Sequence, residues 1–114
     1  MSKRNNSTPK VASVRLLVGE ALKVLVAAPG AGFRLRIFSI LATIVESAAQ
    51  RVDIGVAGGG ATQQIISIPA SATFPTLYDS DEGFVLPANT ALSAKPAAAG
   101  PAVQFLVEYI VEQI

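Results

Sequence analysis

Short runs of this chain alternate apolar and polar residues at a period of two, and this alternation restricts the fold more than any other feature. In the run RVDIGV, which begins at Arg51, every second residue is Val or Ile and the intervening residues are Arg, Asp and Gly. Alternate side chains of a β-strand point to opposite faces, so this run predicts a strand with one buried and one solvated face. Gly, Pro, Asn and Asp separate such runs, which favours an all-β fold.

The longest run, FRLRIFSILATIVE, begins with the same alternation and becomes apolar on both faces from Phe38 onward. We expect its second half to be a central strand that is covered on both sides, by its own fold or by a neighbouring subunit. A helix remains an alternative for the run VRLLVGEALKVLVAA, because its apolar residues also fit a helical spacing. The predicted strands are Ala12–Val18, Leu22–Ala27, Phe33–Glu46, Arg51–Val56, Gln63–Ile68, Gly83–Leu86, Ala91–Ala94 and Val103–Ile114.

Eight short strands in a chain of 114 residues predict a single β-sandwich domain. An immunoglobulin-like sandwich normally fills its core with Trp and often with a disulfide, and this chain has no Trp and no Cys. A jelly-roll-like sandwich is therefore preferred. The first ten residues, MSKRNNSTPK, are polar and basic and have no apolar pattern to bury. They predict a flexible arm at residues 1–10, followed by the jelly-roll domain at residues 11–114.

Composition indicates how much of the surface is apolar. Apolar residues make up 51% of the chain, charged residues make up 15%, and the mean hydropathy is +0.49. A buried oligomer interface would account for this apolarity.

A membrane is not expected, because the longest charge-free run, at 54–78, is interrupted by glycines, glutamines and prolines. Export through a signal peptide is not expected either, because Arg15, Glu20 and Lys23 interrupt each candidate apolar core near the start.

Several kinds of chemistry find no support in the residues. The chain has no Cys, so it has neither a disulfide nor a thiolate metal site, and it has no His, the commonest general base near neutral pH. A net charge of +1 argues against nucleic acid as a partner. The sequence therefore predicts no catalytic residue, no metal and no cofactor.

The densest group of charge is Asp79, Asp81 and Glu82. Such carboxylates could bind calcium or act as an acid and base pair, but a solvated turn before a strand at Phe84 is the favoured interpretation. The three glycines at 58–60 lack the residues of a phosphate-binding loop and predict a hairpin tip.

Two basic residues, Arg34 and Arg36, fall on one strand face and could form a basic strip with Arg15 and Lys23. The favoured interpretation is that these arginines form the solvated side of a strand or pair with a carboxylate. The candidate partners are Glu46, Glu108 and Glu112.

The final strand shows two faces. One face is apolar and predicts core, whereas the other mixes Gln104, Glu108 and Glu112 with Leu106 and Ile110. Leu106 and Ile110 therefore predict a partly covered surface, and a neighbouring copy of the chain could cover it. Scattered exposed apolar residues that need no partner remain the alternative.

The stretches AAPGAGFRLRIFSI and DEGFVLPANTALSAKPAAAGPAVQFLVEYI resemble parts of a known group of proteins. The first resembles an early turn rich in Ala and Gly that leads into a basic and apolar strand. The second resembles a closing unit of turns, short strands and a terminal strand. Both are similar to the small jelly-roll capsid decoration (cement) and head-fibre proteins of tailed bacteriophages.

This resemblance implies a non-enzymatic structural protein of the virion, made in the host cytoplasm and placed on the capsid surface. It implies a homotrimer that binds the major capsid protein and stabilises the shell. Lys3, Arg4 and Lys10 are the candidate capsid-binding residues of the arm, and Leu106 and Ile110 are the candidate subunit interface. The alternative is a carbohydrate-binding sandwich, or a receptor-binding component of a tail fibre, with Tyr78, Asp79 and Asp81 as the nearest site.

Overall fold

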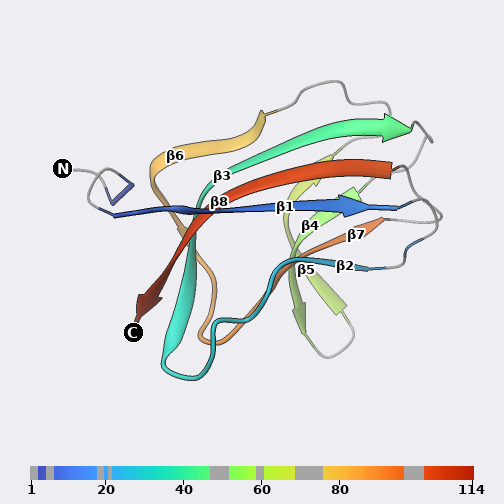
Figure 1. Cartoon of the computed structure of the whole chain (residues 1–114). Coiled ribbons are helices and arrows are strands. Elements are labelled where there is room, and N and C mark those ends of the chain that lie inside the picture. Colours follow the sequence, from blue (N-terminus) through green and yellow to red (C-terminus); the bar gives the residue numbers. More distant parts are fainter. Residues whose placement is uncertain are drawn as a thin grey trace.

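The computed structural model of the chain describes residues 3–4, 7–17, 20, 22–46, 52–58, 61–68, 76–96 and 102–114 (Figure 1). No helix in this part is long and apolar enough to cross a membrane. The strands are β1 (Lys10–Leu16), β2 (Lys23–Val26), β3 (Phe33–Glu46), β4 (Val52–Gly58), β5 (Ala61–Ile68), β6 (Thr76–Val85), β7 (Leu92–Pro96) and β8 (Ala102–Gln113).

The strands form two four-stranded sheets, in the orders β1-β8-β3-β6 and β2-β7-β4-β5. Every pairing of neighbouring strands is antiparallel. The first strand pairs with the last, the second with the seventh, the third with the sixth and the fourth with the fifth, and these pairs alternate between the two sheets. This order is that of a jelly roll, and it confirms the predicted β-sandwich.

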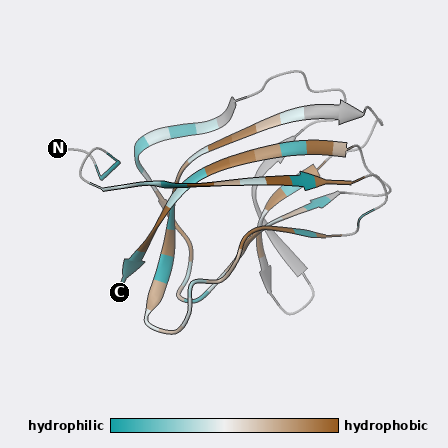
Figure 2. Ribbon diagram, viewed as in Figure 1, coloured by the Kyte–Doolittle hydropathy of each residue, from teal (hydrophilic) through white to brown (hydrophobic). Residues whose placement is uncertain are grey.

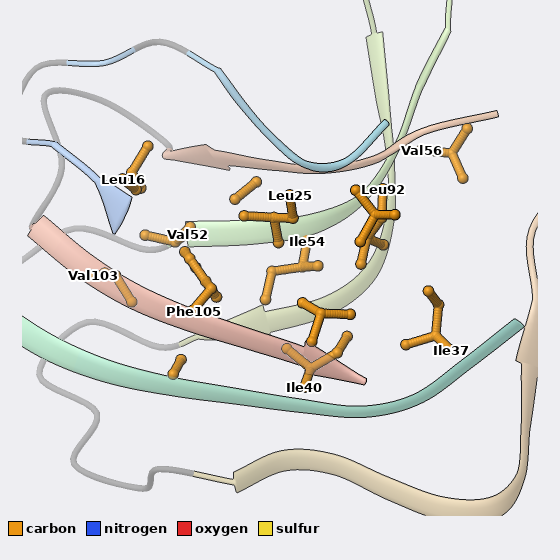
Figure 3. Packing of buried hydrophobic residues seen from close by; sticks show 14 of the residues in the cluster. Leu16, Leu25, Ile37, Ile40, Val52, Ile54, Val56, Leu92, Val103 and Phe105 are labelled. Carbon is orange, nitrogen blue, oxygen red and sulfur yellow. The ribbon is translucent and has the colours of Figure 1, made fainter. Parts of the chain in front are cut away.

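The core lies between the two sheets, where apolar side chains from both inner faces meet (Figure 3). The predicted alternation is visible on β4, where Val52 and Ile54 are fully buried, and on β8, where Phe105 and Val107 are fully buried. Figure 2 shows hydrophobic and hydrophilic residues following one another along β8 and along the lower part of β3. One face of each of these strands therefore supplies the core, as a half-buried strand requires.

Seven of the predicted strands agree with the structure to within two residues at each end. The helical alternative near the start of the chain is wrong, because β1 runs to Leu16 and β2 begins at Lys23. The hairpin predicted at 58–60 is confirmed by the pairing of Gly58 with Ala61, although residues 59 and 60 lie outside the described part. The longer part of β6 was missed: the strand begins at Thr76, not at Gly83.

A large bulge explains why the alternation of apolar and polar residues does not predict the start of β6. Ile37 pairs with Phe84 and Ser39 pairs with Asp79, so Phe38 alone lies opposite the β6 segment 80–83. The polar residues of this segment thus interrupt a strand instead of forming the predicted turn before one. The backbone N–H of Gly83 donates a 3.2 Å hydrogen bond to the Ser80 hydroxyl within the bulge.

Gly83 makes this bulge possible. Its φ is +72°, in the left-handed region that favours glycine. A Cβ at this position would lie 2.6 Å from the Ile37 carbonyl oxygen and 3.0 Å from the ring of Phe38, which is fully buried. The missing side chain therefore lets the bulge close over Phe38.

The substitution Gly83→Ala should destabilise the domain more than Gly32→Ala does. Both positions have positive φ, but a Cβ at Gly32 would meet nothing within 4 Å. We expect a cost of about 1–2 kcal/mol at Gly32 from the backbone conformation. At Gly83 we expect about 1–3 kcal/mol more from the steric clash. Denaturant unfolding of both variants measures the difference, and equal losses would contradict the proposed packing at the bulge.

Candidate interaction surface

The outer face of the sheet β1-β8-β3-β6 mixes exposed apolar side chains with paired charges. Ser13, Leu106 and Leu41 lie side by side on three neighbouring strands, because Leu106 pairs with Ser13 on one side and with Leu41 on the other. The neighbouring strands add Val11 and Val85, which are 66% and 40% exposed. This face therefore presents apolar surface that the domain itself does not cover.

Both predicted interface residues lie on this face of β8. Leu106 is 41% exposed, and Ile110 is half-buried. Glu108 lies between them on the same face, because alternate residues of a strand share a side. The structure thus places an ionisable group between the two apolar residues.

The described part of the predicted arm contacts this face. The guanidinium of Arg4 forms ion pairs with Asp79 of β6 and Glu108 of β8, and it lies 3.7 Å from Asp81. The backbone N–H of Arg4 donates a 2.9 Å hydrogen bond to the Asp81 carbonyl oxygen. The Ser39 hydroxyl, on β3 between these strands, lies 3.4 Å from the Glu108 carboxylate. We call this arrangement of Arg4 with its three carboxylates the Arg4 clasp.

The clasp has a clear electrostatic consequence. The hydrogen bonds that the Arg4 guanidinium donates to Glu108 and Asp79 raise its pKa above the ordinary value, because both carboxylates favour its charged form. The other two candidate arm residues are placed differently. Lys3 is exposed, and Lys10 is exposed as the first residue of β1, where it pairs with Tyr109.

The acidic group on β6, which we call the acidic knuckle, consists of Asp79, Asp81 and Glu82. The side chains of Asp79 and Asp81 are 56% and 64% exposed, and Glu82 is exposed as well. Among the described residues, no group of three or more acidic, His or Cys side chains is arranged to hold a metal ion. Apart from the contacts with Arg4, the knuckle faces solvent and presents negative charge.

A second charged cluster joins β3 to β8. The carboxylate of Glu112 accepts hydrogen bonds from Arg34 at 2.7 Å and from Arg36 through both of its oxygens at 3.0 Å. Arg36 also donates to the carbonyl oxygen of Glu82 at 2.8 Å, which ties the bulge of β6 to the same cluster. These hydrogen bonds, led by those from Arg36, lower the pKa of Glu112, although partial burial acts in the opposite direction.

The ion pairs predicted for Arg34 and Arg36 are therefore confirmed with Glu112 as the partner. The remaining members of the predicted basic strip have polar partners too: Arg15 donates to Gln104 at 3.1 Å, and Lys23 lies 3.6 Å from Glu20. The side chain of Glu46 lies outside the described part.

The residues proposed for sugar binding do not form an open platform. The ring of Tyr78 packs edge-on against Phe84, with ring centroids 4.8 Å apart, and Tyr78 also packs against the core. Tyr78 is half-buried as a result. Its neighbours Asp79 and Asp81 contact Arg4. This packing does not favour the carbohydrate-binding alternative.

Sequence reasoning missed the Arg4 clasp. Arg4 is separated from Asp79 by 75 positions and from Glu108 by 104. The only signal in the sequence is complementary charge, and many other pairings of basic and acidic residues satisfy that signal equally well. The clasp depends on the strand order that brings β8 and β6 onto one sheet face.

We expect Glu112→Gln to reduce stability at neutral pH by about 1–3 kcal/mol, because two charged donors lose their ionised acceptor. A carboxylate whose folded-state pKa is lowered stabilises the fold above its ordinary pKa. That contribution disappears as the pH falls through the lowered value, so the two proteins should converge in stability at strongly acid pH. Chemical denaturation across an acid pH series measures both effects.

Glu82→Gln provides the matched control, because Glu82 is an exposed carboxylate whose backbone, not its side chain, contacts Arg36. Its effect should stay within about 0.5 kcal/mol. A constant gap between Glu112→Gln and the wild type at every pH would show that ionisation of Glu112 plays no part.

No protein-family model and no curated protein sequence matches this chain. Its structure is similar to that of a chain in the acidic stable capsid structure of Helicobacter pylori bacteriophage KHP30. The TM-score is 0.66 and the sequence identity is 14%, and the match covers 95% of each chain. The two chains therefore share a jelly-roll fold over almost their whole length.

Proposed function

We propose that this chain is a structural protein of a phage virion, namely a decoration or cement protein that binds the assembled capsid as a homotrimer. The observation that carries the proposal is the fold shared, over 95% of both chains, with a chain of a phage capsid structure. The likeness of residues 27–40 and 81–110 to decoration proteins points the same way. The role is non-enzymatic, and the protein acts through its surfaces.

The charged groups of the described residues support such a role. Arg34 and Arg36 join β3 to the neighbouring strand β8 through Glu112, and the Arg4 clasp joins β8 to β6 across β3. These ion pairs stabilise one sheet and give its outer face a charged pattern that another protein can contact.

The homotrimer would use the outer face of β8. Leu106 is exposed there and Ile110 is half-buried, and covering them removes apolar area from water. Val11 lies diagonally from Leu106 across the β1-β8 pairing and extends the same apolar surface.

Attachment to the capsid would involve the exposed lysines of the arm, Lys3 and Lys10, and the major capsid protein as partner. Many identical copies that bind only the assembled lattice stabilise that lattice by mass action. A trimer presents three arms at once, so weak individual contacts add up to firm attachment.

The first test is whether the chain is a virion component. Particles of the phage whose genome encodes the chain are purified, and peptides of the chain are quantified against those of the major capsid protein by mass spectrometry. We expect a fixed stoichiometric ratio in intact particles. Absence of the chain from purified particles, or a coding sequence outside any phage or prophage genome, would overturn the proposal.

The trimer is tested by light scattering on the purified protein. We expect about three times the 11.8 kDa chain mass. Leu106→Gln should shift this mass toward that of one chain, because a polar side chain at the interface core lacks partners. Val24→Gln is the control, since Val24 is 48% exposed but lies on β2 of the other sheet. Equal effects of the two substitutions would remove the β8 face from the interface.

Capsid attachment is tested with the double variant Lys3→Gln and Lys10→Gln, in co-sedimentation with capsids that lack the protein. The loss of two exposed positive charges should weaken binding and reduce its sensitivity to salt, because salt screens only the charged contacts that remain. Point substitutions are preferred to deletion of the arm, because Lys10 belongs to β1. Lys95→Gln, an exposed lysine of β7, is the control. Undiminished binding by the double variant would exclude these lysines as the attachment site.

A further inference from the structure

We propose that Arg4 neutralises Glu108 within each chain, and that this pairing lets a second copy cover the outer face of β8. The inference rests on the homotrimer of the proposed function, because it concerns the face that the copies share there. It goes further by giving Arg4 a role inside its own chain. Arg4 is a positioning residue of the interface, and not a residue that reaches the capsid.

Glu108 stands at the centre of the proposed interface. It is two residues from Leu106 and two residues from Ile110 on the same face of β8, so about 7 Å of strand separates it from each. A second copy that covers both apolar residues must therefore also cover Glu108. The side chain of Glu108 is 21% exposed in the single chain, so protein has already replaced part of its water.

A lone carboxylate at this position would oppose association. Covering an ionised group removes its remaining water, and the cost is large unless other groups replace those hydrogen bonds. The Ser39 hydroxyl, at 3.4 Å, is a distant and weak donor to Glu108. Glu108 therefore needs a charged partner before burial of the apolar residues on either side of it can drive association.

Arg4 is the charged partner that the fold supplies. One row of residues crosses the sheet from β1 to β6, because its neighbouring members pair in register. The row consists of Val11, Glu108, Ser39 and Asp79. Arg4 pairs with Glu108 through one guanidinium nitrogen and with Asp79 through another, so its side chain spans the position of Ser39. The guanidinium thus lies in the middle of the face, not at its rim.

The other arginines near this row are engaged elsewhere. Arg34 and Arg36 bind Glu112. In the part of the chain that the structure describes, no basic side chain other than Arg4 forms a salt bridge with Glu108. Loss of Arg4 would therefore leave Glu108 without a charged partner.

The pairing should matter more for association than for folding. In the single chain the Arg4 side chain is 27% exposed, and solvent weakens the attraction between its charge and the carboxylates. A second copy that covers this face excludes water and lowers the local dielectric constant, which strengthens the same attraction. Loss of Arg4 should thus affect the oligomer more than it affects the folded chain.

The test is a double-mutant cycle on the mass of the purified protein, measured by light scattering over a dilution series. Arg4→Gln should raise the concentration at which half of the trimer dissociates about tenfold or more, because Glu108 keeps its charge without a partner. Glu108→Gln removes that charge, so adding Arg4→Gln to Glu108→Gln should change this concentration less than about threefold. Denaturant unfolding of the same variants checks that each chain folds.

Asp79→Asn separates neutralisation of Glu108 from the shape of the clasp. It removes the other ion-pair partner of the guanidinium but leaves Arg4 paired with Glu108. We expect association within about threefold of the wild type. A loss equal to that of Arg4→Gln would overturn the inference, because the position of the arm, and not the charge of Glu108, would then control the interface.

The outcomes also distinguish this inference from the homotrimer itself. A single-chain mass for the wild type at every concentration removes both. A wild-type trimer that Arg4→Gln leaves unchanged keeps the trimer and overturns the inference. Dissociation of Arg4→Gln that persists when Glu108→Gln is added overturns it too, because neutralisation would not be the cause. Dissociation of Arg4→Gln with recovery in the double variant supports it.

Discussion

The antiparallel pairing of β3 with β8 is the contact on which the rest of the structure depends. Its register runs from Phe33 opposite Gln113 to Glu46 opposite Ala102, and β1 and β6 attach on either side of this pair. The pairing also fixes which face of β8 enters the core and which face is presented outward, because a shift of one residue would exchange them. These strands lie far apart in the sequence, so the sandwich forms through long-range contacts that must all be in place together.

Two charged clusters, Arg36 with Glu112 and the Arg4 clasp, connect strands of this sheet. Arg36 joins β3 to β8 through Glu112 and reaches the bulge of β6 through the Glu82 carbonyl oxygen. The Arg4 clasp joins the same β6 segment to β8 from the outer side. The bulge thus has two anchors on the outer face of the sheet, and Gly83 gives it the space that a side chain would remove. The acidic knuckle is held in place by the same ion pairs that connect the strands of this sheet.

The period-two pattern predicted most of the fold because burial on one face of a strand is a local property. It located β4 and β8 correctly and gave both ends of β3. It failed on β6, where Asp79 and the following polar residues have the composition of a turn but remain within a bulged strand. It failed on the Arg4 clasp because no local pattern links residues that are more than seventy positions apart.

The sequence by itself determined that the chain is all-β, that it carries no cysteine or histidine chemistry, and that β8 has one apolar and one mixed face. These properties follow from composition and from the alternation of side chains along single strands. Only the tertiary structure decided the jelly-roll order of the strands, the pairing of Glu112 with two arginines and the position of Arg4 between Asp79 and Glu108. The physical reason is that a charged side chain finds its partner through the order and register of the strands, which emerge when the two apolar faces close on each other.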